Sequence, residues 1–246
     1  MDPLSLIGAF LALVVLVAGI ILKGGTIAEL WNLAALIIVF GGTLSAVILH
    51  TPMPVVKRAL SIVRWVFSPP RLHAPDLVSR IVGWSETSRR QGLLGLEPSI
   101  ETEPDPLTRK GLQLLVDGTE PEVIRSVLEV EISTREHTDM DAARMFEQAG
   151  VYSPTMGIIG AVMGLMAVMQ NLADPSKLGS GIAAAFVSTI YGISLAYLFM
   201  LPMAAKLKSI ARSRTRLHEL LVEGLISIAQ GENPRRIESK LKGFLP

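Results

Sequence analysis

The stretch that decides the fold is YSPTMGIIGAVMGLMAVMQN, which runs from Tyr152 to Asn171. It contains no charged residue, and Gly157, Gly160 and Gly164 recur every three or four residues, so they share one face of a helix. A soluble core would fill that face with larger side chains, because each glycine costs about 1 kcal/mol of helix propensity. The pattern therefore indicates a membrane helix whose bare face packs closely against another helix.

Three more windows of this chain lack charged residues, and a helix needs about 20 residues to cross the hydrocarbon core of a bilayer. The first window has neither a basic leading segment nor a small-residue cleavage site before Lys23, so we expect a retained span rather than a signal peptide. The sequence thus predicts four spans, over Leu4–Leu22, Leu30–Leu49, Gly150–Ala173 and Leu178–Ala205.

The basic residues predict the orientation of these spans. The segment between the second and third spans holds 12 Lys and Arg, the tail from Lys206 holds 9, and each short connection holds one lysine. By the positive-inside rule we expect both large polar parts and both termini in the cytoplasm. The chain has no cysteine, which excludes disulfides and thiolate metal sites and fits polar parts in a reducing compartment.

No strand-like alternation occurs, so the predicted fold class is all-α. The expected organisation is spans 1 and 2 in residues 1–50, a cytoplasmic helical insert in 51–149, spans 3 and 4 in 150–205, and cytoplasmic C-terminal helices in 206–246.

Within the polar parts, helical spacing predicts several helices. An amphipathic helix should follow His50, with Val56, Leu60, Val63 and Phe67 on its apolar face. Helices are also expected over Asp76–Arg90, with Asp76 as its cap, and over Leu107–Val116, whereas LEPSIETEPDP (residues 96–106) is expected to be a loop.

A capping box formed by Thr119 and Glu122 is expected to open a long helix that runs into the third span. After the fourth span, an amphipathic helix should bury Leu217, Leu220, Leu221, Leu225 and Ile228, and Asn233-Pro234 should start a last helix.

Several classes of chemistry lack their signatures. There is no phosphate-binding loop, the four histidines have no metal-ligand spacing, and no Ser/His/Asp arrangement is suggested, so we expect no enzyme. The formal charge is close to zero, which gives no reason to expect a nucleic-acid partner. None of the four windows contains a carboxylate. If this chain moves ions, another polypeptide must supply the titrating group.

The fourth span repeats the small-residue pattern, and Thr189 flanks its line of small residues. Two alternatives remain open at this point. In the first, the two faces hold helices together, either spans 3 and 4 of one chain or neighbouring copies of the chain. In the second, the two faces line a pore or surround a helix of another protein. Pro154 and Pro202 mark the cytoplasmic boundary of these spans, where they either end a helix or bend it. The small residues on that line of the fourth span are Gly181, Ala185, Ser188, Gly192 and Ala196.

The combination of SPTMGIIGAVMG, STIYGISLAYLFMLPMA, SRRQGLLGLE and GENPRRIESKL resembles the MotA family of flagellar stator proteins, in the MotA/TolQ/ExbB superfamily. The resemblance covers essentially the whole chain and looks most like the MotC branch. It implies a homopentamer in the bacterial inner membrane around two single-span MotB- or MotD-type partners. Each partner would carry a membrane aspartate and a peptidoglycan-binding domain, and proton flow would drive flagellar rotation, chemotaxis and motility.

The resemblance also implies roles for residues. Pro154 and Pro202 match the positions of conformational coupling, and Thr189 matches a pore-facing hydroxyl, with Ser188 beside it. Thr155 and Ala161 would complete the ion path, and Ala161 stands where sodium-driven relatives carry threonine, which favours protons over sodium. No other cofactor is expected. The helix-packing positions, facing neighbours and the partner, would be Gly157, Gly160, Gly164, Gly181, Ala185 and Gly192.

Arg89 and Glu97 match the family's rotor-contacting charged pair, with Arg90 adjacent, so the resemblance implies contact with the rotor switch protein FliG. The alternative is a solvated helix face. Two rival functions also stay open, namely a Tol/Exb-type energiser of the outer membrane and a non-conducting membrane scaffold. Tol and Exb relatives typically have three spans, so the fourth span argues for the stator.

Overall fold

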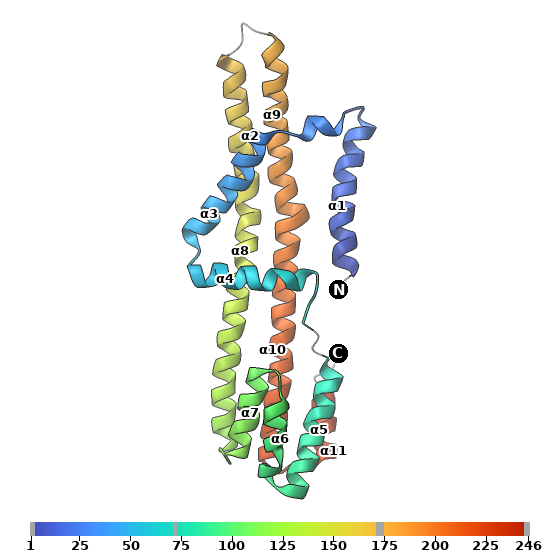
Figure 1. Ribbon diagram of the computed structural model, residues 1–246, viewed down its shortest axis with the longest axis vertical. Coiled ribbons are helices and arrows are strands. Elements are labelled where there is room, and N and C mark those ends of the chain that lie inside the picture. The colour runs from blue at the N-terminus through green and yellow to red at the C-terminus, as the bar shows by residue number, and fades with distance from the viewer. Residues whose placement is uncertain (1–2, 71–72, 171–174, 244–246) are drawn as a thin grey trace. The chain divides into compact units, whose positions relative to one another are not determined.

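The computed structural model describes residues 3–70, 73–170 and 175–243, which form helices joined by short turns, with no strand among them (Figure 1). The chain divides into two compact units. Residues 1–69 and 138–209 form the first, here called the span unit, and residues 70–137 and 210–246 form the second, the polar unit. Two helices belong partly to each unit, α8 (Pro121–Gln170) and α10 (Leu201–Ala229).

The structure has four helices that are long and apolar enough to cross a membrane, which confirms the number of spans predicted from the sequence. The first is α1 (Pro3–Leu22), which the short turn η1 (Ile27–Leu30) follows. The second joins α2 (Leu33–Leu36), the π-helical segment η2 (Ile37–Gly41) and α3 (Gly42–His50). The third is the end of α8, and the fourth joins α9 (Pro175–Ser194), the π-helical segment η5 (Leu195–Met200) and the start of α10.

The described part of the third span ends three residues before its predicted end. Helix α8 continues to Gln170, and the predicted end of the third span at Ala173 lies outside the described residues. The described part of the fourth span begins within α9. Helices are the form expected here, because every backbone polar group in hydrocarbon must be bonded within its own segment.

The predicted amphipathic helix after His50 is present as α4 (Met53–Ile62) and the 3₁₀ turn η3 (Val63–Val66). The predicted apolar face does not pack inside this chain, because Leu60 is 66% exposed and Phe67 is 38% exposed. The face that packs inward instead consists of Ala59, Ile62, Trp65 and Val66.

The orientation of α4 follows from a buried carboxylate on α8. Asp139 is 5% exposed, and Arg58 Nε donates to its Oδ1 at 2.6 Å. The guanidinium of Arg58 also lies 5.3 Å from the centre of the Trp65 ring, in cation–π geometry. A buried carboxylate requires such a partner, so the ion pair fixes which side of α4 faces α8.

The polar unit has one hydrophobic core. Its helices are α5 (Ala74–Gln91), the turn η4 (Leu93–Leu96), α6 (Glu97–Thr102), α7 (Pro106–Val116), the start of α8, the end of α10, and α11 (Pro234–Lys242). The predicted apolar side of the C-terminal helix is buried in this core, except that Leu217 is only partly buried. The largest fully buried side chains include Ile81, Leu107, Leu112, Ile124, Leu128, Leu220, Leu221 and Leu225.

Helix ends in the polar unit agree with the sequence at some positions and correct it at others. The Asn233 side chain caps α11, as expected, by accepting from the Arg235 amide at 3.0 Å. Helix α8 begins with Pro121, which makes Glu120 the cap position, so the predicted capping box at Thr119 is wrong. Helix α5 begins at Ala74, so Asp76 lies in its first turn rather than at its cap.

The stretch LEPSIETEPDP was expected to be a loop, but Glu97–Thr102 form α6. Pro98 lies in the first turn of that helix, where a missing amide removes no hydrogen bond. Prolines and acidic residues therefore start this helix instead of preventing it, and only residues 103–105 remain irregular before α7.

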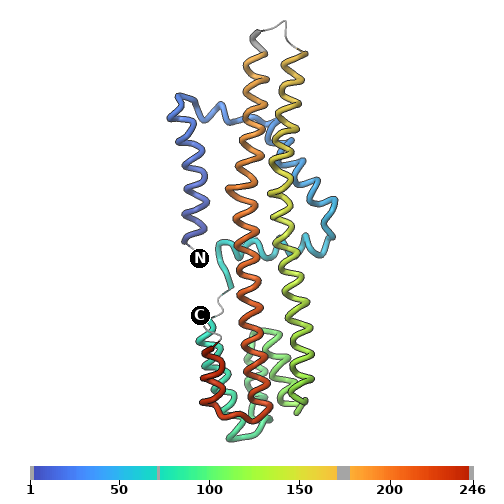
Figure 2. The backbone as a smooth tube through the Cα atoms, turned by 180° about the vertical axis from the view of Figure 1, so that it is seen from behind, coloured from blue at the N-terminus to red at the C-terminus, as the bar shows by residue number. Residues whose placement is uncertain are grey.

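The two small-residue faces pack on each other within this chain. Helices α8 and α9 lie side by side in Figures 1 and 2. A Cβ added at Gly192 would lie 2.5 Å from the carbonyl oxygen of Ser153 and 2.9 Å from the Cα of Gly157. About two turns further, a Cβ on Gly164 would lie 3.1 Å from the backbone nitrogen of Ala185. The bare face of the third span is thus occupied by the fourth span of the same chain.

Gly192→Ala should destabilise the span unit by about 1–3 kcal/mol, because the new methyl group would meet backbone atoms that cannot rotate away. Thermal unfolding of the purified protein in mild detergent measures this. Gly41→Ala is the matched control, since a Cβ there meets nothing within 4 Å. Equal melting temperatures for the two variants would contradict the close contact.

The polar unit should lose stability in acid through Glu223. Lys240 donates a hydrogen bond to this carboxylate and, with Arg125 at 3.1 Å, lowers its pKa, although partial burial acts in the opposite direction. A lowered pKa stabilises the fold fully above the unfolded pKa, and this stability is lost as the pH falls through the lower, folded pKa.

Hydrogen exchange of the α11 amides between pH 7 and pH 3 measures this loss, because Lys240 lies on α11. Glu223→Gln should weaken protection at pH 7 and flatten its pH dependence. Glu86→Gln removes an exposed carboxylate and should leave the profile unchanged. A wild-type profile in Glu223→Gln would show that this pair does not hold α11.

Candidate functional site

The two adjacent hydroxyls predicted for the ion path point in different directions. Thr189 is partly buried, and its Oγ1 donates to the Ala185 carbonyl at 3.2 Å, one turn earlier in α9. Ser188 is 1% exposed and faces α8 instead. Successive residues of a helix lie about 100° apart around its axis, so the structure does not bring these two side chains together at one surface.

Ser188 and Gly160 form a matched pair across the contact between α8 and α9. A Cβ on Gly160 would lie 1.9 Å from the Oγ of Ser188, so the glycine provides the space that the hydroxyl occupies. That Oγ has no hydrogen-bond partner among the described residues. A buried hydroxyl without a hydrogen-bond partner costs free energy in an apolar surrounding. Ser188 therefore carries such an unsatisfied polar group in the described part of the isolated chain.

Two further buried hydroxyls were missed by the sequence analysis. Ser153 is fully buried on α8 and Thr43 is 4% exposed on α3, and neither Oγ has a partner among the described residues. Ser153 directly precedes Pro154, and Thr43 follows two glycines, so a search for hydroxyls beside prolines and glycines in the spans would have found both. Buried hydroxyls thus come from the second, third and fourth spans.

Thr155 and Ala161, the other two residues predicted for the ion path, lie on α8. Thr155 is exposed on α8, and Ala161 is partly buried. Because α9 covers the glycine face, the exposed side of α8 is the side available to another polypeptide or to lipid. Thr155 lies on that available side.

Neither proline ends a helix, so the helix-end alternative is wrong. Pro154 lies inside α8, and Pro202 lies in the first turn of α10, directly after the π-helical segment η5. Proline has no amide hydrogen, so each removes one bond from the helical ladder. π-Helical segments are rare and occur often at functional sites. The fourth span therefore has a locally weakened segment from Leu195 to Pro202.

The three predicted rotor-contact residues lie close together in the chain at the α5–α6 junction of the polar unit. Arg89 and Arg90 are in the last turn of α5, and Glu97 is the first residue of α6. Gly92, with φ of 75°, turns the chain between them. All three side chains are exposed, and their charges also complement the dipoles of the helix ends they occupy.

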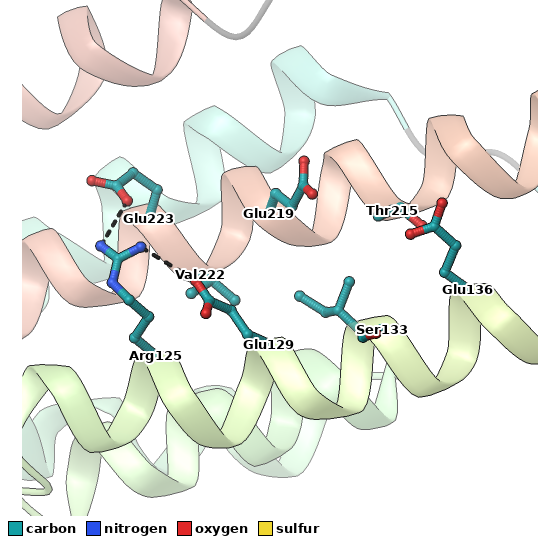
Figure 3. Close-up of a pocket in the computed structure, with 9 residues that line it drawn as sticks. Arg125, Glu129, Ser133, Glu136, Thr215, Glu219, Val222 and Glu223 are labelled. Carbon is teal, nitrogen blue, oxygen red and sulfur yellow. Dashed lines mark hydrogen bonds and ion pairs between the residues drawn. The ribbon is translucent and has the colours of Figure 1, made fainter.

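A hollow of about 360 Å³ lies between α8 and α10 in the polar unit and is lined by several glutamates (Figure 3). Arg125 pairs with Glu129 of its own helix at 3.5 Å and with Glu223 of α10 at 3.1 Å. No group of residues suited to a metal ion occurs in the part of the chain that the structure describes. The geometry fits ion pairing between two long helices.

Comparison with family models matches two regions of the chain. Residues 99–219 match the MotA/TolQ/ExbB proton channel family, and residues 6–90 match the motility protein A N-terminal region. Motility protein A of Bacillus subtilis strain 168 is 39% identical over 100% of this chain and 92% of its own length. Motility protein A of Helicobacter pylori strain 26695 is 34% identical over 100% of this chain and 95% of its own.

Two solved structures are similar over the whole chain. The MotAB structure from C. jejuni matches with a TM-score of 0.95 at 30% identity, covering 100% of this chain and 96% of that one. The flagellar MotAB stator complex from Bacillus subtilis matches with a TM-score of 0.92 at 39% identity and the same coverage. This chain therefore belongs to the motility protein A family, within the MotA/TolQ/ExbB proton channel family.

Proposed function

We propose that this chain is a stator subunit of the flagellar motor, which works with a MotB-type partner to convert inward proton flow into torque on the rotor. The observation that carries the proposal is the match over its full length to the stator complex of Bacillus subtilis. The described span residues contain no Asp or Glu, so the titrating carboxylate of the ion path would come from the partner.

In this mechanism, protons cross between this chain and the membrane aspartate of the partner. The Thr189 hydroxyl, now donating to Ala185, is the group on α9 that can exchange its backbone bond for a bond to the partner's carboxylate. Each proton neutralises that aspartate and each release recharges it. One charge moved through 100 mV supplies about 2.3 kcal/mol, which is enough to shift a bistable helix contact.

The weakened segment from Leu195 to Pro202 is the part of the fourth span proposed to respond, with Pro154 as its counterpart on α8. Helices α8 and α10 pass from the span unit into the polar unit, so they offer a continuous covalent and hydrogen-bonded route for displacement. The exposed charges Arg89, Arg90 and Glu97 would then engage the rotor switch protein FliG by electrostatic steering.

Protons are the proposed coupling ion. A sodium site needs several oxygen ligands, whereas a proton needs one titratable group and a hydrogen-bonded path. Ala161 adds a methyl group where a hydroxyl would help a sodium ion, and Thr155 and Thr189 remain as hydroxyls on α8 and α9. The cytoplasmic location of the polar unit, the inner membrane and a pentameric assembly belong to the same proposal.

Native mass spectrometry of the complex from its own membrane tests the assembly. Five copies with two single-span chains, each bearing a membrane aspartate and a peptidoglycan-binding domain, are expected. A partner without that domain would instead favour the Tol/Exb-type energiser. Copies of this chain alone would favour the non-conducting scaffold.

Thr189→Val should abolish rotation while leaving the complex assembled, because the side chain keeps its shape and loses its hydroxyl. Proton uptake by vesicles containing the complex and swimming speed are the two measurements. Thr189→Ser retains the hydroxyl and should keep much of both. Normal swimming in the valine variant would exclude Thr189 from the path.

Reversing both charges in Arg89→Glu/Arg90→Glu should reduce torque strongly. A single neutral substitution should have a small effect, because an exposed ion pair contributes only about 0–1 kcal/mol. Torque is measured on tethered cells, and proton uptake should be unchanged. Arg235→Glu/Arg236→Glu is the matched control, with the same charge change on exposed residues of α11. Equal torque loss in both double variants would indicate a net-charge effect rather than a local contact.

A further inference from the structure

A groove of about 520 Å³ opens along α1 in the span unit. Helix α1 forms one wall, the segment from Tyr197 to Lys206 forms the other, and Val66 and Phe67 close one side. No residue of α1 is buried, and Figure 2 shows α1 standing clear of α9. The described part of the chain therefore leaves an apolar face of α1 uncovered.

The length of the groove matches one leaflet of a bilayer. The α1 wall runs from Ser5 to Val15, about 15 Å along a helix, and the facing wall from Tyr197 to Lys206 is of similar length. The hydrocarbon core of a bilayer is about 30 Å thick, so each wall spans about half of it. An elongated apolar groove of this depth fits the chain of a lipid in a single leaflet.

The charge in the groove is at one end. Lys206 is the one charged side chain among the described residues that line it, and its Nζ donates to Ser5 Oγ at the same end. A lysine ammonium attracts the anionic oxygens of a phosphate and forms charge-assisted hydrogen bonds with them. The positive-inside rule places this end at the cytoplasmic leaflet, which carries anionic lipids.

We propose that this groove binds one anionic phospholipid of the cytoplasmic leaflet. Its phosphate would lie at Lys206 and Ser5, and one acyl chain would run along Gly8 and Ala12. Water is a poor occupant, because the apolar walls offer it few hydrogen-bond partners. Hydrocarbon is the solvent around membrane helices, so a lipid chain is the natural occupant of an apolar groove that opens toward the bilayer.

The site also touches the weakened segment of the fourth span. Leu198 and Phe199 of η5 and Pro202 of α10 line the groove opposite α1. A bound lipid would fill the space beside a segment whose helical bonding is irregular and would support it there. The features that indicate a lipid in this groove involve neither proton flow nor a rotor contact, so the lipid site can be tested separately from the proposed function.

Two glycines on α1 provide a matched pair of variants. Gly8 lines the groove and Gly19 does not, and a Cβ on either meets nothing within 4 Å. Gly8→Leu would therefore place a side chain in the groove from a position where its Cβ has room. Gly19→Leu adds the same side chain to the same helix elsewhere.

The experiment is to purify each variant of the complex from its native membrane in mild detergent and to identify retained lipids by native mass spectrometry. We expect one anionic phospholipid per chain in the wild type and in Gly19→Leu, and its loss in Gly8→Leu. Lys206→Gln should lower the preference for anionic over zwitterionic lipid about fivefold. Lys57→Gln, which removes an exposed lysine of α4, should leave that preference unchanged.

Equal lipid retention in Gly8→Leu and Gly19→Leu would overturn the proposal, because the lipid would then bind elsewhere. A wild type free of lipid would also overturn it. The chain has no cysteine, so a single Gly8→Cys substitution with a bifunctional thiol reagent reports what lies in the groove. Efficient crosslinking between two copies would show that a second copy of this chain, and not a lipid, covers this face.

Discussion

The direct backbone contact between Gly157 on α8 and Gly192 on α9 is the constraint on which the span unit depends. Larger residues at either position would separate the two helices, since both added Cβ atoms would meet backbone. In hydrocarbon, close approach of helices is stabilised by dispersion and weak polar contacts rather than by exclusion of water. Small residues therefore hold these two helices together, as leucine side chains do in a soluble core.

This close contact also determines which surfaces remain for partners. Because α9 covers the glycine face of α8, Ser188 is enclosed with Gly160, and Thr155 is left on the opposite, exposed side. The sides of α8 and α9 that carry Thr155 and Thr189 thus remain for the partner helix of the proposed function. The glycines act indirectly, by fixing how those hydroxyls are presented.

The sequence predicted the features that depend on local composition or on periodicity. Four spans, the continuity of α8 and the cap of α11 follow from charge-free windows, helical spacing and the Asn-Pro pair. The sequence did not predict features that depend on a contact between residues far apart in the chain. The inward face of α4 depends on the pair between Arg58 and Asp139, which lie far apart in the sequence.

The same limit applies to the candidate site. Positions of Thr189, Pro154 and Pro202 were recognisable as motifs, but the directions of Ser188 and Thr189 became clear only once the neighbour of α9 was known. The π-helical segments Ile37–Gly41 and Leu195–Met200 have no sequence signature, because they reflect a local shift in backbone bonding within ordinary apolar runs.

The division of the polar unit into residues 70–137 and 210–246 has a consequence for biosynthesis. Ile81, Leu112 and Leu128 are made early, but Leu220, Leu221 and Leu225, which bury them, are made only after the third and fourth spans. The nascent polar unit must therefore expose an incomplete apolar core until the last two spans have been inserted. A chain that fails to insert them correctly cannot bring its tail to that core, so it would remain open to chaperones and proteases, which gives the cell a means of removing misinserted subunits.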